Sequence, residues 1–407
     1  MSLLLDSLFN AVAYGHFIVD VLNGQRSVLL TYWSQELGLS NSWLAMVSTI
    51  YVWGASLSQP VFGWITDRFG KTRLMAAGGI LWLTGFFALA LFLPLNWAIP
   101  CLILGSLGSA SFHPSGATQA TLRGRTLLAG RETTSTSWFF LFGQFGYFMG
   151  PILGGPLLQH FGPGGLLLLA VPALAIGLNA AWRLRTPVQA AEAGADPAPA
   201  TRLAQSGAAG QGSRTAALAR GKASFIGALI VVAGLQSWAQ QNMNTFLPKY
   251  LSDLGQTPTV YGLLTGLFMG GSALGNVLGG ALADRFGHRR VAVFMLALAS
   301  LPLIAIAQVG WTGWLYLLVP LAGACTGAVH SIIVVLAQRL LKGGMALASG
   351  LTLGFMFSAG ALGTLLSGPL ADQWGFAPVF LMTAGLAGIA SLAALGLREN
   401  QVTAENA

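Results

Sequence analysis

Long apolar runs dominate this sequence and limit what it can fold into. The chain has 407 residues, of which 54% are hydrophobic and only 8% are charged, whereas soluble domains carry about 25% charged residues. Apolar stretches of about 20 residues recur from end to end, and a helix of that length crosses roughly 30 Å of hydrocarbon. The composition therefore predicts an all-α integral membrane protein.

The positions of the apolar runs predict twelve transmembrane helices in two pseudo-symmetric six-helix bundles. Between the sixth and the seventh helix, segment 186–221 is rich in Ala, Gly, Gln and Pro, so we expect a flexible cytoplasmic linker there. The expected domains are a first bundle over 1–185, this linker, a second bundle over 222–398 and a cytoplasmic tail over 399–407. The helices are expected at 8–33, 43–65, 73–93, 97–121, 133–160, 164–184, 223–251, 258–283, 290–309, 312–341, 346–371 and 376–397.

One polar segment of the first half returns in the second half. Residues 63–73 read Gly-Trp-Ile-Thr-Asp-Arg-Phe-Gly-Lys-Thr-Arg, and residues 280–290 read Gly-Ala-Leu-Ala-Asp-Arg-Phe-Gly-His-Arg-Arg, the same frame 217 positions later. His113 and His330 are separated by the same offset. One offset shared by two features indicates a duplicated protein whose halves are structurally related.

Each repeated segment forms a short polar turn between two apolar runs. In the first, Asp67 could cap the N-terminus of the helix at 346–371 through the helix dipole, and Gly70 permits a tight turn. A purely orienting role for the basic residues is the alternative, and the two matched copies argue against it. We therefore predict a cytoplasmic gate formed by Gly63, Asp67, Arg68, Gly70, Arg73, Gly280, Asp284, Arg285 and Gly287.

Lysine and arginine residues fall almost entirely in the turns on one face of this arrangement, with Arg26 and Lys249 as exceptions. Such a bias marks the cytoplasmic side. Both termini and the linker are therefore expected in the cytoplasm, and the protein in the inner (plasma) membrane. The net charge of +8 is thus a topology signal, and no nucleic-acid partner is implied.

The first helix carries the most informative polar residues. His16 and Asp20 are spaced i,i+4 and share one face with Asn23. A carboxylate at membrane depth costs at least about 2.5 kcal/mol, so Asp20 should face water or a partner. We predict a proton-coupling site of Asp20, His16 and His113. The alternative is that Asp20 only pairs with Arg26 or His16 to hold the helix in place.

Further polar groups predict a substrate site between the bundles. His113 precedes Pro114, which should disrupt its helix and free backbone carbonyls. The helix at 223–251 carries several amides, with Ser237 at the position equivalent to Asp20. Hydrogen bonding between helices is the alternative role of such groups. The predicted substrate contacts are Asn23, Arg26, Gln59, His113, Gln144, Gln236, Gln240, Asn244 and His330.

The fifth helix contains a run of small residues with a proline. Their spacing predicts a close helix–helix contact, and Pro151 predicts a kink. The stretch resembles the Gly-Pro motif that drug and proton antiporters of the major facilitator superfamily carry in this helix, and the two repeated turns resemble that superfamily's loop signature. The predicted antiporter motif comprises Gly146, Gly150, Pro151, Gly154 and Gly155.

Four short motifs narrow the resemblance. His16-x-x-x-Asp20, Leu57-Ser58-Gln59-Pro60, Phe112-His113-Pro114 and Ala337-Gln338 resemble the fosmidomycin-resistance family of bacterial efflux transporters, across both halves but not the linker. The resemblance implies export of small organic compounds in exchange for protons, and a part in antibiotic resistance.

The chain also departs from that family's pattern. Ser115 and Thr118 stand where similar proteins carry an acidic residue and an arginine, and Arg26 stands at a usually uncharged place. We interpret this as a rearranged polar site in which Arg26 supplies the membrane cation, so fosmidomycin itself is not assumed as the substrate.

These observations lead us to expect a monomeric secondary active transporter. In this interpretation it is a proton-coupled antiporter that exports small organic compounds by alternating access. The alternatives are proton-independent or uptake transport of a sugar or organic anion, and a non-transporting membrane receptor or scaffold. No hydrolase or metalloprotease motif is found, so we expect no enzyme, no cofactor and no metal. The expected partners are a small-molecule substrate, protons and the lipid bilayer.

Overall fold

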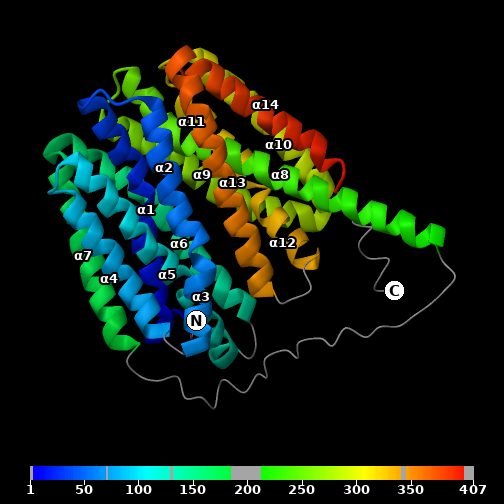
Figure 1. Cartoon of the computed structure of the whole chain (residues 1–407), viewed down its shortest axis with the longest axis horizontal. Helices are drawn as coiled ribbons and strands as arrows, with labels where there is room; N and C mark the ends of the chain where they lie inside the picture. The colour runs from blue at the N-terminus through cyan, green and yellow to red at the C-terminus, as the bar shows by residue number, and fades with distance from the viewer. Residues whose placement is uncertain (1–2, 70–71, 129–131, 185–211, 341–344, 398–407) are drawn as a thin grey trace.

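The structure, a computed structural model, describes residues 3–69, 72–128, 132–184, 212–340 and 345–397. Every regular element in these ranges is helical, and the long helices run side by side (Figure 1). The helices of the first half are α1 (Ser7–Glu36), α2 (Asn41–Leu57), α3 (Gln59–Phe69), α4 (Thr72–Ala90), α5 (Leu95–Leu127), α6 (Glu132–Phe161) and α7 (Leu167–Arg183), with 3-10 turns η1 (Leu3–Leu5) and η2 (Pro163–Leu166).

The second half repeats this order. Its long first helix projects beyond the others at one end (Figure 1). Its helices are α8 (Gly212–Asp253), α9 (Pro258–Phe286), α10 (His288–Val309), α11 (Leu315–Gly327), α12 (His330–Leu340), α13 (Met345–Trp374) and α14 (Phe376–Ala394).

Twelve membrane spans are confirmed, but two are broken rather than continuous. The second span divides at Ser58 into α2 and α3, and Pro60, the second residue of α3, has no N–H to donate across the break. The tenth divides after Gly327 into α11 and α12. In the described part of the chain, nine spans are long and apolar enough to cross a membrane, and α1, α2–α3 and α6 complete the twelve.

Helix α8 corrects the expected linker. It begins at Gly212, so part of the predicted linker 186–221 is helical. The strong helix formers of residues 216–220, Ala-Ala-Leu-Ala-Arg, explain this start. The remainder of the linker and the tail at 399–407 lie outside the described residues.

The two ends of the bundles differ, and we name them by their turns. The basic face carries the end of α3, the start of α4 and the turn at 286–288, and the distal face carries the turns at 37–40 and 254–257. On the basic face, Asp6 caps α1 by accepting a hydrogen bond from the backbone N–H of Phe9 (2.7 Å). Arg123 of α5 also donates to this carboxylate (3.0 and 2.7 Å), so the start of α1 is tied to α5.

Hydrogen bonds join the two bundles between α2 and α13. The hydroxyl of Thr49 donates to the carbonyl of Ala361 (2.7 Å), and the indole of Trp53 donates to the carbonyl of Ser358 (3.1 Å). At the distal end, Asp372 accepts from the backbone N–H groups of Asn41 (2.6 Å) and Ser42 (3.0 Å) and so caps α2 from the opposite bundle. We call this the hydrogen-bonded seam.

A second contact between the bundles is built from glycines on α6 and α9. A methyl group added at Gly262 would collide with the carbonyl oxygen of Pro151, and one added at Gly155 would collide with that of Pro258. The backbones therefore touch, as small residues permit. The Gln159 carboxamide oxygen accepts from the N–H of Thr259 (3.3 Å) at the distal end. We call this the glycine seam.

Candidate functional site

A buried acidic cluster lies halfway along α1. The Asp20 carboxylate meets His16 Nε2 through Oδ2 (3.2 Å) and His113 Nε2 of α5 through Oδ1 (3.5 Å). The side chain of His16 is 4% exposed and that of Asp20 is 9% exposed, whereas that of His113 is 22% exposed. The structure thus brings together the three residues predicted for proton coupling, with His113 nearest to solvent.

Backbone carbonyls fix which nitrogen of each histidine faces the carboxylate. His16 Nδ1 lies 2.8 Å from the carbonyl oxygen of Phe139 on α6, and His113 Nδ1 lies 2.7 Å from that of Ser109. A carbonyl oxygen only accepts, so each Nδ1 carries its hydrogen and each Nε2 is left to share a proton with Asp20.

These contacts define the protonation chemistry of the cluster. The 3.2 Å contact between His16 Nε2 and Asp20 needs a proton between its atoms, because two lone pairs facing one another repel, and the longer 3.5 Å contact to His113 can hold a second. With one shared proton the three groups are neutral overall, and with two they carry one positive charge. The three ligand atoms lie within 4.8 Å of one another, close enough to act on a single cation.

Asn23 extends the cluster toward α2 and α5. Its amide nitrogen donates to Asp20 Oδ1 (2.9 Å) and to the hydroxyl of Ser109 (3.0 Å). Its carbonyl oxygen accepts from the hydroxyl of Tyr51 (2.7 Å). The predicted contact Asn23 therefore positions the carboxylate, and its own polar atoms are occupied by neighbours.

Arg26 does not pair with Asp20. Its guanidinium stacks over the Tyr51 ring, with Cζ 4.4 Å from the ring centroid, and the residue is 2% exposed. The alternative in which an Asp20–Arg26 ion pair holds α1 in place is therefore wrong. Asp20 pairs instead with His16, the other partner named in that alternative, and with His113 of α5.

Helix α5 corrects a further expectation. It runs unbroken from Leu95 to Leu127 with Pro114 inside it, so the predicted disruption beside His113 is absent. The Ser109 carbonyl that His113 contacts belongs to the turn before the proline. His113 is thus held by an intact helix, which fixes the direction of its ring toward α1.

The second half carries a neutral polar network at the related place. Gln236 Nε2 donates to Gln240 Oε1 (2.8 Å) and to the carbonyl of Thr326 (2.9 Å), and Gln240 Nε2 donates to the hydroxyl of Ser272 (2.6 Å). Ser237 donates to Gln236 Oε1 (3.3 Å). These bonds match the alternative structural role expected for such amides, and they join α8 to α9 and α11.

The other predicted substrate contacts are scattered. Gln59 at the start of α3 and Gln144 on α6 are half-buried. Asn244 on α8 is buried, and its side-chain oxygen has no hydrogen-bond partner among the described residues. His330 begins α12, half-buried, with its ring 6.4 Å from that of Phe357. The structure does not gather these four into one cluster with Asp20.

Those predicted gate residues that the structure describes lie toward the basic face. Arg68, Arg73, Asp284 and Arg285 are exposed there. Gly287 has φ +92°, a conformation in which glycine avoids steric strain, at the turn before α10. Gly63 and Gly280 are half-buried within α3 and α9, while Gly70 and the side chain of Asp67, with its predicted cap on α13, lie outside the described residues.

The helix-five motif makes two contacts. A methyl group at Gly146 or Gly150 would collide with a carbonyl oxygen of α1, and one at Gly154 would crowd the Gln25 side chain. Pro151 and Gly155 instead touch α9 in the glycine seam. The motif thus packs α6 between the helix of the acidic cluster and the opposite bundle.

Sequence reasoning missed Tyr51, Ser109 and Asp372. Ser109 was within reach, because Thr326 lies 217 positions later and both contribute to the polar networks. Tyr51 and Asp372 had no such signal, since their roles depend on which helices become neighbours.

Comparisons with known proteins agree with this architecture. The profile of the Major Facilitator Superfamily matches residues 14–236 and 229–406. The uncharacterized MFS-type transporter YfnC of Bacillus subtilis (strain 168) is 30% identical over 383 residues, covering 91% of this chain and 86% of that protein. The fosmidomycin resistance protein of Escherichia coli (strain K12) is 25% identical over 391 residues, covering 93% and 90%.

Solved structures share the fold. The crystal structure of the nucleoside transporter NupG superposes with a TM-score of 0.73 at 15% identity, covering 96% of this chain and 98% of that one. The profile match over both halves, the relative at 30% identity and the twelve spans lead to one conclusion. The chain belongs to the Major Facilitator Superfamily and is a multi-pass, non-enzymatic membrane transporter.

Proposed function

We propose that this transporter exports small organic compounds in exchange for protons, and that the acidic cluster is its proton site. The observation that carries the proposal is the Asp20 carboxylate held between the buried His16 and the partly exposed His113. Ionisable groups at membrane depth are costly and generally serve function. A carboxylate with two imidazole partners can take up and release protons.

His113 is the entry point for protons in this proposal. Its side chain is the most exposed of the three and contacts the carboxylate. A proton would pass from water to His113 Nε2, then to Asp20, and could be shared with His16. Removing the last shared proton leaves a net negative charge in a buried site, so deprotonation has to be compensated by substrate or by movement of the bundles.

The arrangement of the bundles supports alternating access in the proposal. Both seams join the bundles in their distal halves, while Arg68 and Asp284 on the basic face are exposed. With the basic face in the cytoplasm, as the distribution of Lys and Arg favours, this is the state that would take up substrate from the cell. The basic turns would form the gate that closes next.

The direction of transport rests on the relatives. One is named a fosmidomycin resistance protein, and another, from Salmonella typhi, is named the putative multidrug resistance protein MdtD and is 26% identical over 362 residues. Both names denote resistance, which favours export over uptake. In the proposal, His113 and the half-buried Gln59, Gln144 and His330 contact the substrate.

The test uses the purified protein in liposomes that enclose a pH-sensitive dye. Cationic, neutral and anionic drugs, phosphonates and sugars are added in turn, and wild type is compared with Asp20→Asn. We expect substrate-driven proton movement in wild type and its loss, by about a hundredfold or more, in Asp20→Asn, which keeps the shape but cannot ionise.

Two controls make the result decisive. Lys249→Gln, which removes a membrane-helix cation paired with Asp253, should leave proton movement unchanged. Binding of the same compound to Asp20→Asn separates loss of coupling from loss of folding. Substrate flux without any proton movement in wild type would overturn the antiport proposal and favour facilitated diffusion.

A further inference from the structure

Arg26 carries a buried positive charge inside the first bundle. It is 2% exposed, and its Nε and Nη1 atoms are buried without a hydrogen-bond partner among the described residues. An arginine stays protonated under all physiological conditions, and a buried charge without a partner costs several kcal/mol. The guanidinium therefore needs a negative group that the neighbouring side chains do not supply.

Asp20, on the same helix, is already in use. Both oxygens of Asp20 are occupied by His16, His113 and Asn23. Tyr51 lies against the guanidinium with the face of its ring and donates its hydroxyl to Asn23. A ring face attracts a desolvated cation by about 2 kcal/mol but carries no net charge, so it does not replace an anion.

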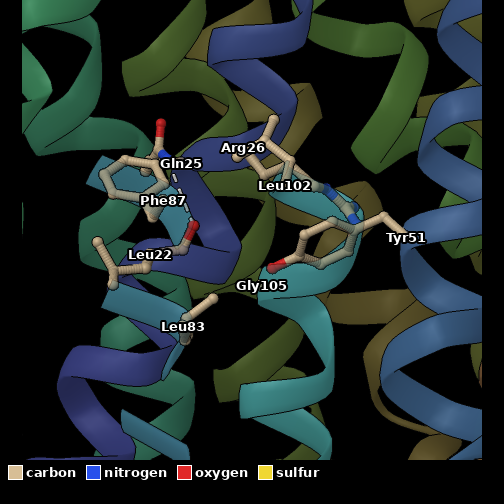
Figure 2. Close-up of a pocket in the computed structure, with 8 residues that line it drawn as sticks. All are labelled: Leu22, Gln25, Arg26, Tyr51, Leu83, Phe87, Leu102 and Gly105. Carbon is tan, nitrogen blue, oxygen red and sulfur yellow. Dashed lines mark hydrogen bonds between the residues drawn. The ribbon is translucent and has the colours of Figure 1, made fainter. Parts of the chain in front are cut away.

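A small cavity adjoins the guanidinium. It has a volume of about 10 Å³ and lies among α1, α2, α4 and α5. Figure 2 shows Arg26, Tyr51 and Leu102 on one side and Phe87, Leu22 and Leu83 on the other, with Gln25 donating to the carbonyl of Leu22 (3.4 Å). The lining residues are Leu22, Gln25, Arg26, Tyr51, Leu83, Phe87, Leu102 and Gly105.

We propose that this cavity binds a monatomic anion, chloride under cellular conditions, as the counter-ion of Arg26. A cavity of this size holds about one water-sized particle, so it is too small for a carboxylate or a phosphate group. A water would fill the space without neutralising the charge. The described residues of the walls include no carboxylate that would repel an anion, and apolar walls strengthen its attraction to the guanidinium.

The test measures chloride binding by the full-length protein in detergent. Chloride is titrated against gluconate at constant ionic strength, and the melting temperature and the ³⁵Cl NMR line width are followed. We expect a saturable rise in Tm of about 2 °C or more and a line broadening that bromide displaces and sulfate does not. Arg26→Gln should abolish both effects.

The matched control is Lys249→Gln, which removes a cation that Asp253 already neutralises and should keep the full chloride response. Arg26→Lys keeps the charge without the planar donors and should show a weaker chloride response. It serves as the test variant if Arg26→Gln fails to fold. A wild-type Tm and line width that do not depend on chloride would show that only water occupies the cavity and would overturn the proposal. An equal response to sulfate would also overturn it, because a cavity of about 10 Å³ is too small for sulfate.

Discussion

The two halves of the molecule repeat one framework and fill it with different chemistry. In the first half the framework holds a carboxylate and two imidazoles, and in the second it holds uncharged amides and hydroxyls. The related positions, 217 residues apart, are Asp20 and Ser237, Asn23 and Gln240, Ser109 and Thr326, and His113 and His330.

The difference shows which parts of the cluster are structural and which are chemical. Hydrogen-bonding groups are kept at the positions of Asn23 and Ser109, where they tie the first helix of each half to its neighbours. The acid is present in one half alone. Ala233 stands where His16 would be repeated, and Phe268 stands where Tyr51 would be. Proton chemistry is thus proposed for the first half, and packing and substrate contact for the second.

The sharpest test of this asymmetry replaces each of the two related histidines by glutamine in turn. His113→Gln removes an imidazole that contacts the Asp20 carboxylate, and a hydrogen bond to a charged group is worth about 1.5–3 kcal/mol, so we expect substrate-driven proton flux to fall at least about tenfold. His330→Gln, whose ring faces Phe357, should leave proton flux per substrate unchanged. Equal losses in both variants would contradict the asymmetry. The measurement is dye-reported proton flux in liposomes.

Placing an acid in the second half tests whether its framework tolerates charge. Ser237→Asp buries a carboxylate whose nearest bonded neighbour is the Gln236 amide. Without a histidine at position 233, we expect a loss of about 2.5 kcal/mol of stability or more, seen as a lower Tm at neutral pH. Recovery at acidic pH is expected, because protonation removes the charge. Ser237→Asn, uncharged and of similar size, is the control, and an unchanged Tm in Ser237→Asp would break the comparison.

The smallest effect is expected from the tyrosine hydroxyl. Tyr51→Phe removes the hydrogen bond to Asn23 and makes the position like Phe268 in the other half. One such bond is worth about 0.5–1.5 kcal/mol, so we expect the rate of coupled transport to drop about two- to tenfold while binding of chloride persists. The reciprocal Phe268→Tyr tests specificity and should not raise the rate. A Tyr51→Phe variant with wild-type rates would remove Tyr51 from the cluster.

Much of the architecture could be predicted because hydrophobic length and repeat spacing act locally along the chain. The twelve spans and the grouping of His16 with Asp20 follow from runs of about 20 apolar residues and a four-residue interval. A shared role with His113 was predicted from the sequence, but the contact between His113 and Asp20 arises from the packing of α1 against α5.

The missed features depend on tertiary neighbours or on backbone detail. Whether Pro114 breaks a helix depends on the packing around it, and α5 absorbs it without a break. The break at Ser58, beside Pro60, and the early start of α8 are decided by local backbone energetics. The isolation of Arg26 from Asp20 could not be inferred from spacing, because Tyr51 comes from another helix.

The glycine seam and the hydrogen-bonded seam differ in how they resist movement of one bundle against the other. The contacts of the glycine seam are mostly backbone touching backbone, which can roll over one another without breaking directional bonds. Along α2, separation has to break the bonds of Thr49, Trp53 and the Asp372 cap. The distal face should therefore open beside α2, while α6 and α9 stay in contact and act as the hinge. The first water to enter from that side would meet Thr49 and Asn41.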